Sequence, residues 1–425
     1  MLSKEARALN KTIRQTPFFG LLSKKGKAIY FPKAGFVQQA LDAKGKRIDA
    51  TAGIANEDSG EIMHLPLMAQ RITIKPNRSF SYSPSSGDPE LRQLWKEAIM
   101  DKNPSIKSEI SNPIVTSGIT NGIYIAAYLF AEKGVEVIMP ELYWENYRLV
   151  FENGFGARIR TFQMFKGNRF NIEGLDDAIK ESKRPVVLLN FPNNPTGYTL
   201  TVEESRAVSD VISNNASQRP IAVICDDAYF GLVYKEGIDR ESIFPKLIEK
   251  DNVLAVKCDG TTKENFAWGL RVGFITFGMK NGTREMYEAF EKKTIGAIRG
   301  SVSSSCTLSQ SLMVECLKDN NYRAEKQEKF NILKQRFEEM ERMIGEEKYR
   351  KYLEPLPFNS GYFMCMNLKN IDAEKLRKRL LQKYDTGIIA IDGKIRIAYS
   401  AIPKERIREI FNNICSACEE ISGQK

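Results

Sequence analysis

Between residues 113 and 280 the chain alternates short apolar runs with segments of helical pattern. The runs are rich in β-branched side chains, and apolar residues do not alternate regularly with polar ones, as is typical of strands covered on both faces. They are PIVTSG, VEVIMP, ARIRTFQM, PVVLLN, IAVICDDAY, NVLAVKCDG and RVGFITFG. Helical patterns such as TNGIYIAAYLFAEKG and VEESRAVSDVISNN separate several of them. We therefore predict an α/β fold, a mostly parallel sheet sandwiched by helices.

The pattern changes after about residue 305, where long charged helices are expected over 306–346 and 372–384. This part also contains three expected strands and a last helix: GYFMCMNL, TGIIAI, KIRIAYSA and 403–421. The pattern indicates a smaller α/β unit.

The length of 425 residues, with 42% hydrophobic content, suits two or three structural units. We predict three segments: 1–60, an N-terminal segment that completes the small domain; 61–305, the large domain; and 306–425, the small C-terminal domain.

The apolar content is not concentrated in any one stretch of the chain. No apolar run approaches the ~18 to 20 residues of a membrane span, and the opening MLSKEARALNKTIRQ lacks the apolar stretch of a secretory signal. The seven cysteines are odd in number and scattered, so reduced thiols fit better than disulfides. Cys415 and Cys418 form a lone CxxC, which we interpret as neighbours on one helix face rather than a metal site. We expect a cytoplasmic protein without a metal ion or a membrane partner.

The net charge of +10 raises the question of nucleic acid. Basic residues are interleaved with acidic ones, as in 323–351, which indicates a salt-bridged exposed helix rather than a phosphate-binding stripe. A small anionic ligand explains the excess equally well, so we expect no nucleic-acid partner.

Polar side chains gather where the predicted strands end, and ligands of open parallel sheets bind at that edge. The first strand runs through Gly118, Ile119 and Thr120 into a helix, whose free N–H groups and dipole favour a phosphate. Later edges carry an amide, a carboxylate, a phenol, an amine and a guanidinium. They are Asn194, Asp226, Tyr229, Lys263 and Arg271.

This set of groups suits pyridoxal phosphate. The aldehyde of that cofactor needs a lysine for a Schiff base, and its ring nitrogen needs a carboxylate. Its phenolate oxygen needs donors, and its phosphate needs a helix N-terminus and an arginine.

Six motifs in order resemble the class I/II aminotransferases, the aspartate-aminotransferase-like family of fold type I pyridoxal phosphate enzymes. They are SYSPSSGDPELR at 81–92, NNPTG at 193–197, DDAY at 226–229, Lys263, Arg271 with Gly273 after it, and KIRIAYS at 394–400. The resemblance covers most of the chain from about residue 50 to 400.

The resemblance implies roles for the cofactor-binding residues. Lys263 would form the Schiff base, and Asp226 would bind the ring nitrogen. Asn194 and Tyr229 would hold the phenolate oxygen. Trp144 stands where the family places an aromatic ring over the cofactor, the alternative being a core tryptophan.

The resemblance also implies substrate-binding residues and a partner. Arg396 would clamp the α-carboxylate of the substrate, a task for its planar fork, and Gly53 would also bind the substrate. Tyr82 would reach the phosphate of the neighbouring subunit, which implies a homodimer with shared active sites. Arg299 would bind the distal carboxylate of a substrate in the partner's site, the alternative being a surface arginine on a mobile loop.

The sequence departs from the family pattern at Gly260, where a serine usually stands three residues before the lysine. A phosphate contact is then missing or moves to Thr261 or Thr262. His64, the one histidine, is interpreted as structural, which disfavours a Ser-His or Cys-His mechanism.

The resemblance implies an aminotransferase. Such an enzyme would move an amino group between an L-amino acid, with aspartate favoured, and a 2-oxo acid such as 2-oxoglutarate. Lys263 would act as the general base on the substrate Cα–H. The same residues also suit a β-lyase or a decarboxylase, because the cofactor supplies the chemistry. A non-catalytic regulator of this fold is a distant alternative. Such regulators carry a DNA-binding helix-turn-helix ahead of the fold, whereas the expected fold begins here within the first ~50 residues.

Overall fold

A seven-stranded sheet forms the centre of the molecule in a computed structural model that describes residues 2–32 and 35–423. In sheet order the strands are β2 (Ile114–Thr116), β10 (Gly273–Gly278), β9 (Val253–Gly260), β8 (Ile221–Asp226), β7 (Pro185–Asn190), β3 (Glu136–Pro140) and β4 (Arg158–Phe162). Only β10 runs antiparallel to its neighbours among these strands. The predicted α/β fold with a mostly parallel sheet is confirmed.

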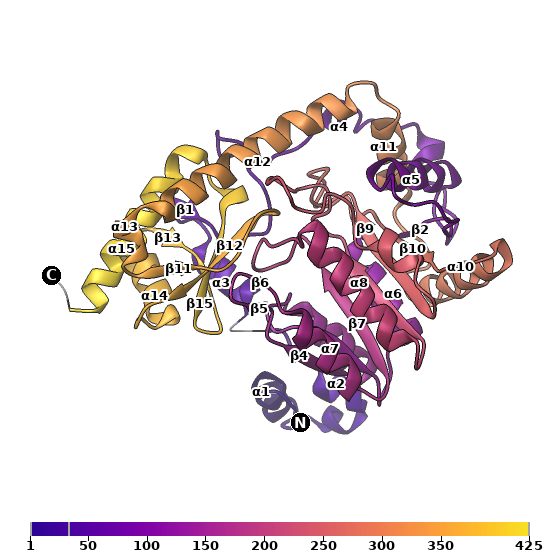
Figure 1. Ribbon diagram of the computed structural model, residues 1–425, viewed down its shortest axis with the longest axis horizontal. Coiled ribbons are helices and arrows are strands. Elements are labelled where there is room, and N and C mark those ends of the chain that lie inside the picture. Colours follow the sequence, from indigo (N-terminus) through magenta and orange to yellow (C-terminus); the bar gives the residue numbers. More distant parts are fainter. Residues whose placement is uncertain (1, 33–34, 424–425) are drawn as a thin grey trace.

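Helices cover both faces of this sheet (Figure 1). On one face lie α6 (Ile119–Phe130) and α10 (Arg284–Arg299). On the other face lie α5 (Pro89–Lys102), α7 (Ile172–Glu181), α8 (Val202–Ala216), α9 (Phe244–Ile248) and α11 (Thr307–Leu317).

The double cover explains why the strand sequences are apolar throughout. In β7, Val186 and Leu188 pack into the core on the α6 face, whereas Val187 and Leu189 pack into the core on the α8 face. Successive strand residues point to opposite faces, and both faces of β7 are buried. A regular alternation of polar and apolar residues would put a polar side chain into one of the two cores.

A four-stranded antiparallel sheet lies beside the large sheet, at the left of Figure 1. Its strands are β11 (Leu353–Pro355), β12 (Phe363–Leu368), β15 (Lys394–Ala398) and β14 (Ile389–Ile391). The helices packed around it include α13 (Glu347–Arg350), α14 (Ala373–Lys383) and α15 (Ile407–Ile421).

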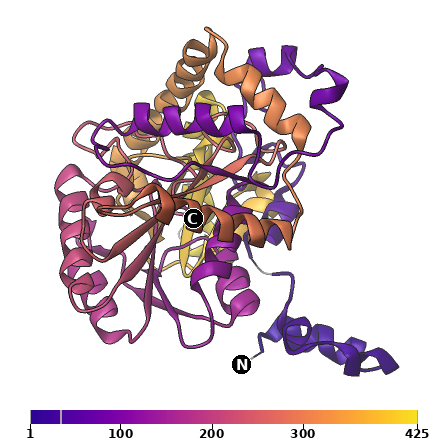
Figure 2. The ribbon, with the colours of Figure 1, turned by 90° about the vertical axis from the view of Figure 1, so that its right-hand side faces the viewer.

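The N-terminal part of the chain reaches this smaller sheet through β1 (Ile48–Asp49), which pairs in parallel with β13 (Thr386–Gly387). The helix α3 (Phe36–Ala43) contacts the same region. Before them, α1 (Lys4–Ile13) and α2 (Lys24–Ala28) extend away from the body, at the lower right of Figure 2. The three-segment division with boundaries at 60 and 305 stays a prediction.

The helix predicted over 306–346 is two helices in the structure. α11 ends at Leu317, and α12 (Tyr322–Gly345) begins after the turn Lys318–Asn321. Asp319 interrupts the helix because its carboxylate accepts a hydrogen bond of 2.8 Å from the backbone N–H of Asn321. Short polar side chains compete in this way for backbone groups and favour turns.

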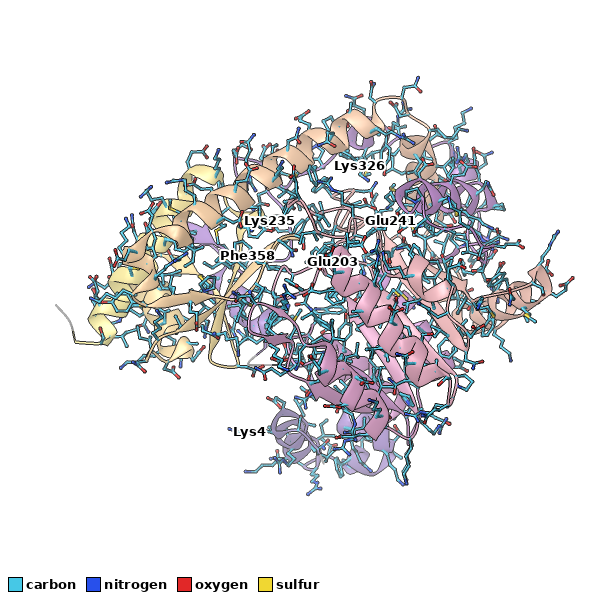
Figure 3. All side chains as sticks on the ribbon, in the orientation of Figure 1. Lys4, Glu203, Lys235, Glu241, Lys326 and Phe358 are labelled. Carbon is cyan, nitrogen blue, oxygen red and sulfur yellow. The ribbon has the colours of Figure 1, made fainter. Side chains whose placement is uncertain are left out.

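Charged side chains cover the outer surface of α12, which runs along the top of the molecule (Figure 3). No helix in the described part of the chain is long and apolar enough to cross a membrane.

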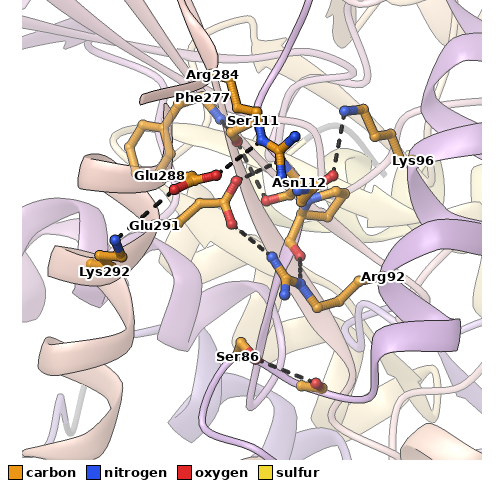
Figure 4. A network of polar contacts seen from close by, with 12 residues as sticks. Ser86, Arg92, Lys96, Ser111, Asn112, Phe277, Arg284, Glu288, Glu291 and Lys292 are labelled. Carbon is orange, nitrogen blue, oxygen red and sulfur yellow. Dashed lines mark hydrogen bonds and ion pairs between the residues drawn. The ribbon is translucent and has the colours of Figure 1, made fainter. Parts of the chain in front are cut away.

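A polar network joins α5 to α10 at the start of β2 (Figure 4). The Arg92 guanidinium donates to the carbonyl of Pro113 at 2.6 Å and to the carboxylate of Glu291 at 2.9 Å. The same carboxylate accepts the N–H of Asn112 at 2.9 Å. The network therefore fixes the segment that leads into β2, the strand that delivers the chain to the predicted phosphate site.

A buried ion network lies at the carboxyl ends of β8 and β9. The Lys257 ammonium, with no exposed side-chain surface, contacts Asp227 and lies 3.5 Å from Asp259. Ser242 donates to Asp227 at 2.7 Å, and the indole N–H of Trp95 donates to Asp259 at 2.9 Å. Two carboxylates thus share one ammonium in the core.

Replacement of Lys257 by methionine is expected to lower the free energy of unfolding by about 3 to 5 kcal/mol, because it leaves two carboxylates buried without a cation. Urea unfolding of the full chain measures the loss. The control is Lys280→Met, whose partner Asp251 is 73% exposed, and it should cost about 1 kcal/mol or less. Equal losses in the two variants would contradict the role of the buried network.

Candidate active site

The carboxyl ends of the central strands meet at a cavity of about 430 Å³. Most of the predicted site residues line it: Gly53, Ile119, Thr120, Trp144, Asn194, Asp226, Tyr229, Lys263, Arg271 and Arg396. The structure therefore brings together groups from positions 53 to 396. The individual roles of these residues stay predictions.

Lys263 stands in the turn that follows β9. Its ammonium donates to the carbonyl of Gly53 at 2.6 Å and lies 5.2 Å from the ring centre of Tyr229. The Tyr362 hydroxyl donates to the backbone carbonyl of Lys263 at 2.8 Å and so anchors the turn.

The environment of the Lys263 amine favours its neutral form. Burial, reinforced by the positive charges of Arg396 and Arg271, lowers the pKa of Lys263 to about 7. No carboxylate lies within ion-pair distance of it among the described residues. A neutral amine at neutral pH is what a nucleophile or a general base requires.

Asp226 ends β8 and is buried. Its carboxylate accepts a hydrogen bond from the Tyr147 hydroxyl and another, at 3.1 Å, from the backbone N–H of Ala228. Burial raises the pKa of Asp226 to about 6. The Asn190 amide donates to the backbone carbonyl of Asp226 at 2.8 Å and accepts the N–H of Asn194 at 2.9 Å, which ties the ends of β7 and β8 together.

Arg396 is a buried cation with two aromatic rings close to its guanidinium. Its guanidinium carbon lies 4.5 Å from the ring centre of Phe36 and 4.3 Å from that of Phe363. It donates to the side-chain oxygen of Asn194 at 3.0 Å and to the carbonyl of Thr51 at 2.6 Å. Burial lowers the pKa of Arg396 to about 10. Within the described residues no carboxylate neutralises this cation, so the site is suited to the carboxylate of a ligand.

An anion-binding corner lies at the N-terminus of α6. Gly118 has a φ of +82°, and a Cβ there would lie 2.3 Å from a guanidinium nitrogen of Arg271. Glycine therefore lets Arg271 lie against the turn before the helix, where free backbone N–H groups point outward.

Two further donors in the cavity are buried and unused. The Thr262 hydroxyl and the Trp268 indole N–H have no hydrogen-bond partner in the part of the chain that the structure describes. Buried polar groups without partners are rare, and each one calls for a ligand or another explanation. These donors, with Arg271 and the α6 N-terminus, fit a phosphate group, and Asp226 with Lys263 fits the rest of pyridoxal phosphate.

The structure explains the glycine at the position where the family usually has serine. A Cβ on Gly260 would lie 2.7 Å from Cα of Gly273 and 2.7 Å from the carbonyl oxygen of Val272. The neighbouring strand is too close for a serine side chain. Of the two alternatives, the Thr261 hydroxyl already bonds to the carbonyl of Val272 at 3.3 Å, which leaves Thr262 as the free hydroxyl.

Trp144 lines the cavity and is half-buried, packed edge-on against Tyr147 with ring centres 5.6 Å apart. One part of its surface is therefore available to a ligand, unlike that of a fully enclosed core tryptophan.

Tyr82 and Arg299 lie outside the cavity of their own chain. Tyr82 is 92% exposed, and Arg299, at the C-terminal end of α10, donates to Ser303 at 2.8 Å. Their expected roles concern a neighbouring subunit and stay predictions. His64 is exposed, with a ring nitrogen 3.0 Å from the carbonyl of Ile62.

The sequence interpretation missed several residues of the site: Phe36, Thr51, Tyr147, Trp268 and Phe363. A signal was available for Tyr147, three residues after Trp144, and for Trp268, three residues before Arg271. Phe36 and Phe363 carried no signal, because only the tertiary fold brings them to Arg396.

The chain is similar to curated aminotransferases. It is 24% identical over 356 residues to a probable aspartate/prephenate aminotransferase of Aquifex aeolicus, covering 80% of this chain and 84% of that one. It is 26% identical over 355 residues to an aspartate aminotransferase of Pyrococcus horikoshii, covering 80% and 83%.

The fold of the chain is also similar to solved structures of aminotransferases. An aminotransferase from Anaerococcus prevotii superposes with a TM-score of 0.83 at 25% identity, covering 93% of this chain and 98% of that one. Aspartate aminotransferase from Thermus thermophilus has the same fold, with a TM-score of 0.74 at 19% identity over 93% and 99% of the two chains. The family model "Aminotransferase class I and II" matches residues 59–414. The chain belongs to the aminotransferase class I and II family and is a pyridoxal-phosphate-dependent transferase of fold type I.

Proposed function

We propose that the enzyme moves an amino group between an L-amino acid, aspartate favoured, and a 2-oxo acid such as 2-oxoglutarate. The observation that carries this proposal is the pairing of an amine of lowered pKa, Lys263, with the buried and carboxylate-free Arg396 in one cavity. The preference for aspartate rests on relatives that are named aspartate aminotransferases.

Pyridoxal phosphate, when bound, supplies an aldehyde that condenses with amines and a ring that withdraws electrons from the substrate Cα. Asp226 would hold the ring nitrogen in its protonated form, and Tyr229 and Asn194 would donate to the ring oxygen. Arg271, Thr262, Trp268 and the α6 N-terminus would hold the phosphate. The contacts of Asp226 with Tyr147 and Ala228 keep its carboxylate fixed for that task.

Arg396 would bind the α-carboxylate of the substrate. The rings of Phe36 and Phe363 lie close to its guanidinium, and the N–H groups in the guanidinium plane can form bidentate hydrogen bonds with a carboxylate. A carboxylate held there places the substrate Cα in the cavity that holds the Lys263 amine. Lys263 would then take the proton from Cα as a general base and deliver it to the aldehyde carbon of the cofactor as a general acid.

We also propose a cytoplasmic homodimer. The exposed side chains of Ile72, Phe80 and Tyr82, which are 63%, 87% and 92% exposed, offer an apolar surface for a second copy. The seven cysteines lie within the described residues, and all are free thiols, which suits a reducing compartment.

Replacement of Lys263 by alanine is expected to abolish both covalent capture of the cofactor by borohydride and activity, with a loss of at least about 10³-fold, because the amine that attacks and carries the proton is removed. The measurements are mass mapping of the reduced cofactor–peptide adduct and an assay with L-aspartate and 2-oxoglutarate. The surface variant Lys280→Ala is the control and should behave as the native chain. Capture at another lysine would refute the assignment, and formation of alanine and carbon dioxide from L-aspartate instead of oxaloacetate would indicate a decarboxylase.

The reactivity of Lys263 is expected to rise with a midpoint near pH 7 in the cofactor-free full chain, since the amine reacts only when neutral and its pKa is about 7. Arg396→Gln removes a positive charge, favours the ammonium form and should raise the midpoint by about one pH unit. Acetylation of Lys263 by acetic anhydride across pH, followed by peptide mass spectrometry, measures it. Arg379→Gln, at the protein surface and paired with Glu420, should leave the midpoint unchanged. A midpoint near 10 in the native chain would contradict this account.

Arg299→Leu is expected to raise KM for aspartate by about tenfold or more, because a charged hydrogen bond to the distal carboxylate is lost, while KM for alanine stays nearly constant. Steady-state kinetics with both amino donors measures the contrast. Arg284→Leu changes an exposed arginine at the other end of the same helix and serves as the control. Equal effects on the two substrates would remove the distal-carboxylate role.

A further inference from the structure

A second cavity, of about 720 Å³, lies behind the turn that carries Lys263. Four parts of the chain form its walls: α5, residues 231–240, residues 264–266 and α12. Its size falls within the range of cavities that bind small molecules. The aminotransferase mechanism uses no residue of this cavity.

One short segment separates the two cavities. Lys263 and Trp268 line the cofactor cavity, whereas Glu264 and Phe266 line the second one. The rings of Phe266 and Trp268 are in contact, with centres 6.0 Å apart. A group that moves Glu264 or Phe266 therefore acts on neighbours that face the cofactor.

The buried charge in the second cavity is a carboxylate between two ammonium groups. Glu264 contacts Lys102 of α5 and accepts a hydrogen bond of 2.9 Å from Lys326 of α12 (labelled in Figure 3). Burial lowers the pKa of Lys102 although Glu264 opposes this effect. One carboxylate faces two ammonium groups, so this cluster carries a net positive charge.

The wall of the cavity carries a net positive charge. Its charged residues comprise four cations and two carboxylates, a net charge of +2: Asp101, Lys102, Arg240, Glu264, Arg323 and Lys326. The neighbouring buried cluster of Lys257, Asp227 and Asp259 has a net charge of −1. The cavity wall and this cluster together therefore keep a net positive charge. Arg240, at the exposed mouth, has no ion-pair partner within the described ranges.

Aromatic side chains supply the apolar part of the wall. Trp95, Phe266 and Phe330 line the cavity together with Leu232 and Val233. A flat hydrocarbon body fits among rings, and a negative group fits beside the two lysines.

We propose that the second cavity binds an organic carboxylate with a flat apolar body, held by Lys102 and Lys326. We further propose that binding of this ligand changes the protonation of Lys263 through the neighbouring Glu264. The ligand carboxylate competes with Glu264 for the two ammonium groups and draws α5 and α12 together. It also brings a negative charge behind Lys263, which favours the ammonium form of that residue. Occupation should therefore raise the pH at which Lys263 becomes reactive.

The binding half of the proposal is tested with 2-naphthoate by isothermal titration calorimetry on the full chain loaded with pyridoxal phosphate. One site per chain is expected. Lys326→Ala should weaken binding by about tenfold or more, and Arg240→Ala should weaken it less. The matched control is Lys334→Ala, on α12 and outside the cavity, which should bind as the native chain.

Two results would overturn the proposed site. One is unchanged affinity in Lys326→Ala and in Lys102→Met. The other is loss of binding in Arg396→Lys, which would place naphthoate in the substrate cavity. Lys326→Ala keeps the Lys102–Glu264 contact, and a thermal melt followed by circular dichroism verifies that this variant folds. Arg240→Ala changes an exposed residue and therefore gives a second measurement of binding in a variant whose folding is not at risk.

The communication half is tested by the acetylation midpoint of Lys263 in the cofactor-free full chain. Saturating 2-naphthoate should raise this midpoint in the native chain and leave it unchanged in Lys326→Ala. An unchanged midpoint at saturation in the native chain would overturn the link to Lys263. Neither measurement uses catalytic turnover, so failure of the proposed aminotransferase activity would be recognised separately.

Discussion

Burial of both faces of the seven-stranded sheet is the constraint on which the rest of the structure depends. Strands without a wet face carry charge only where it is compensated in the core, as Lys257 of β9 is by Asp227 and Asp259, and the charged groups that face the cavity lie where the strands end. At the end of β8, Asp226 faces the cofactor cavity and Asp227 joins the ion network of Lys257. Successive residues point to opposite sides, and the chain uses this property to separate ligand binding from internal charge compensation.

The two sets of charges are balanced differently. On the side of Asp227, ammonium groups and carboxylates are paired within the protein. In the cofactor cavity, Arg396 and Lys263 have no carboxylate within ion-pair distance in the described structure, and Asp226 is held by neutral donors. Burying an uncompensated charge is unfavourable, so this cavity is suited to the anionic groups of a ligand.

The sheet and the residues at its edge were predictable because each depends on local sequence. Apolar runs mark doubly covered strands, and Asn194, Asp226 and Lys263 follow those runs directly. Two features were not predictable. The break between α11 and α12 depends on one aspartate side chain competing for a backbone N–H. The ring pair around Arg396 joins residues 36, 363 and 396, and no local pattern encodes such a contact.

The contact of Phe36 with Arg396 has a consequence for synthesis of the protein. A ribosome makes residue 36 early and residue 396 near the end, whereas the strands from β2 to β10 are complete once residue 278 has emerged. All strands of the central sheet are therefore made before Arg396. Arg396, on the last strand of the smaller sheet, is thus among the last residues of the cavity to be made.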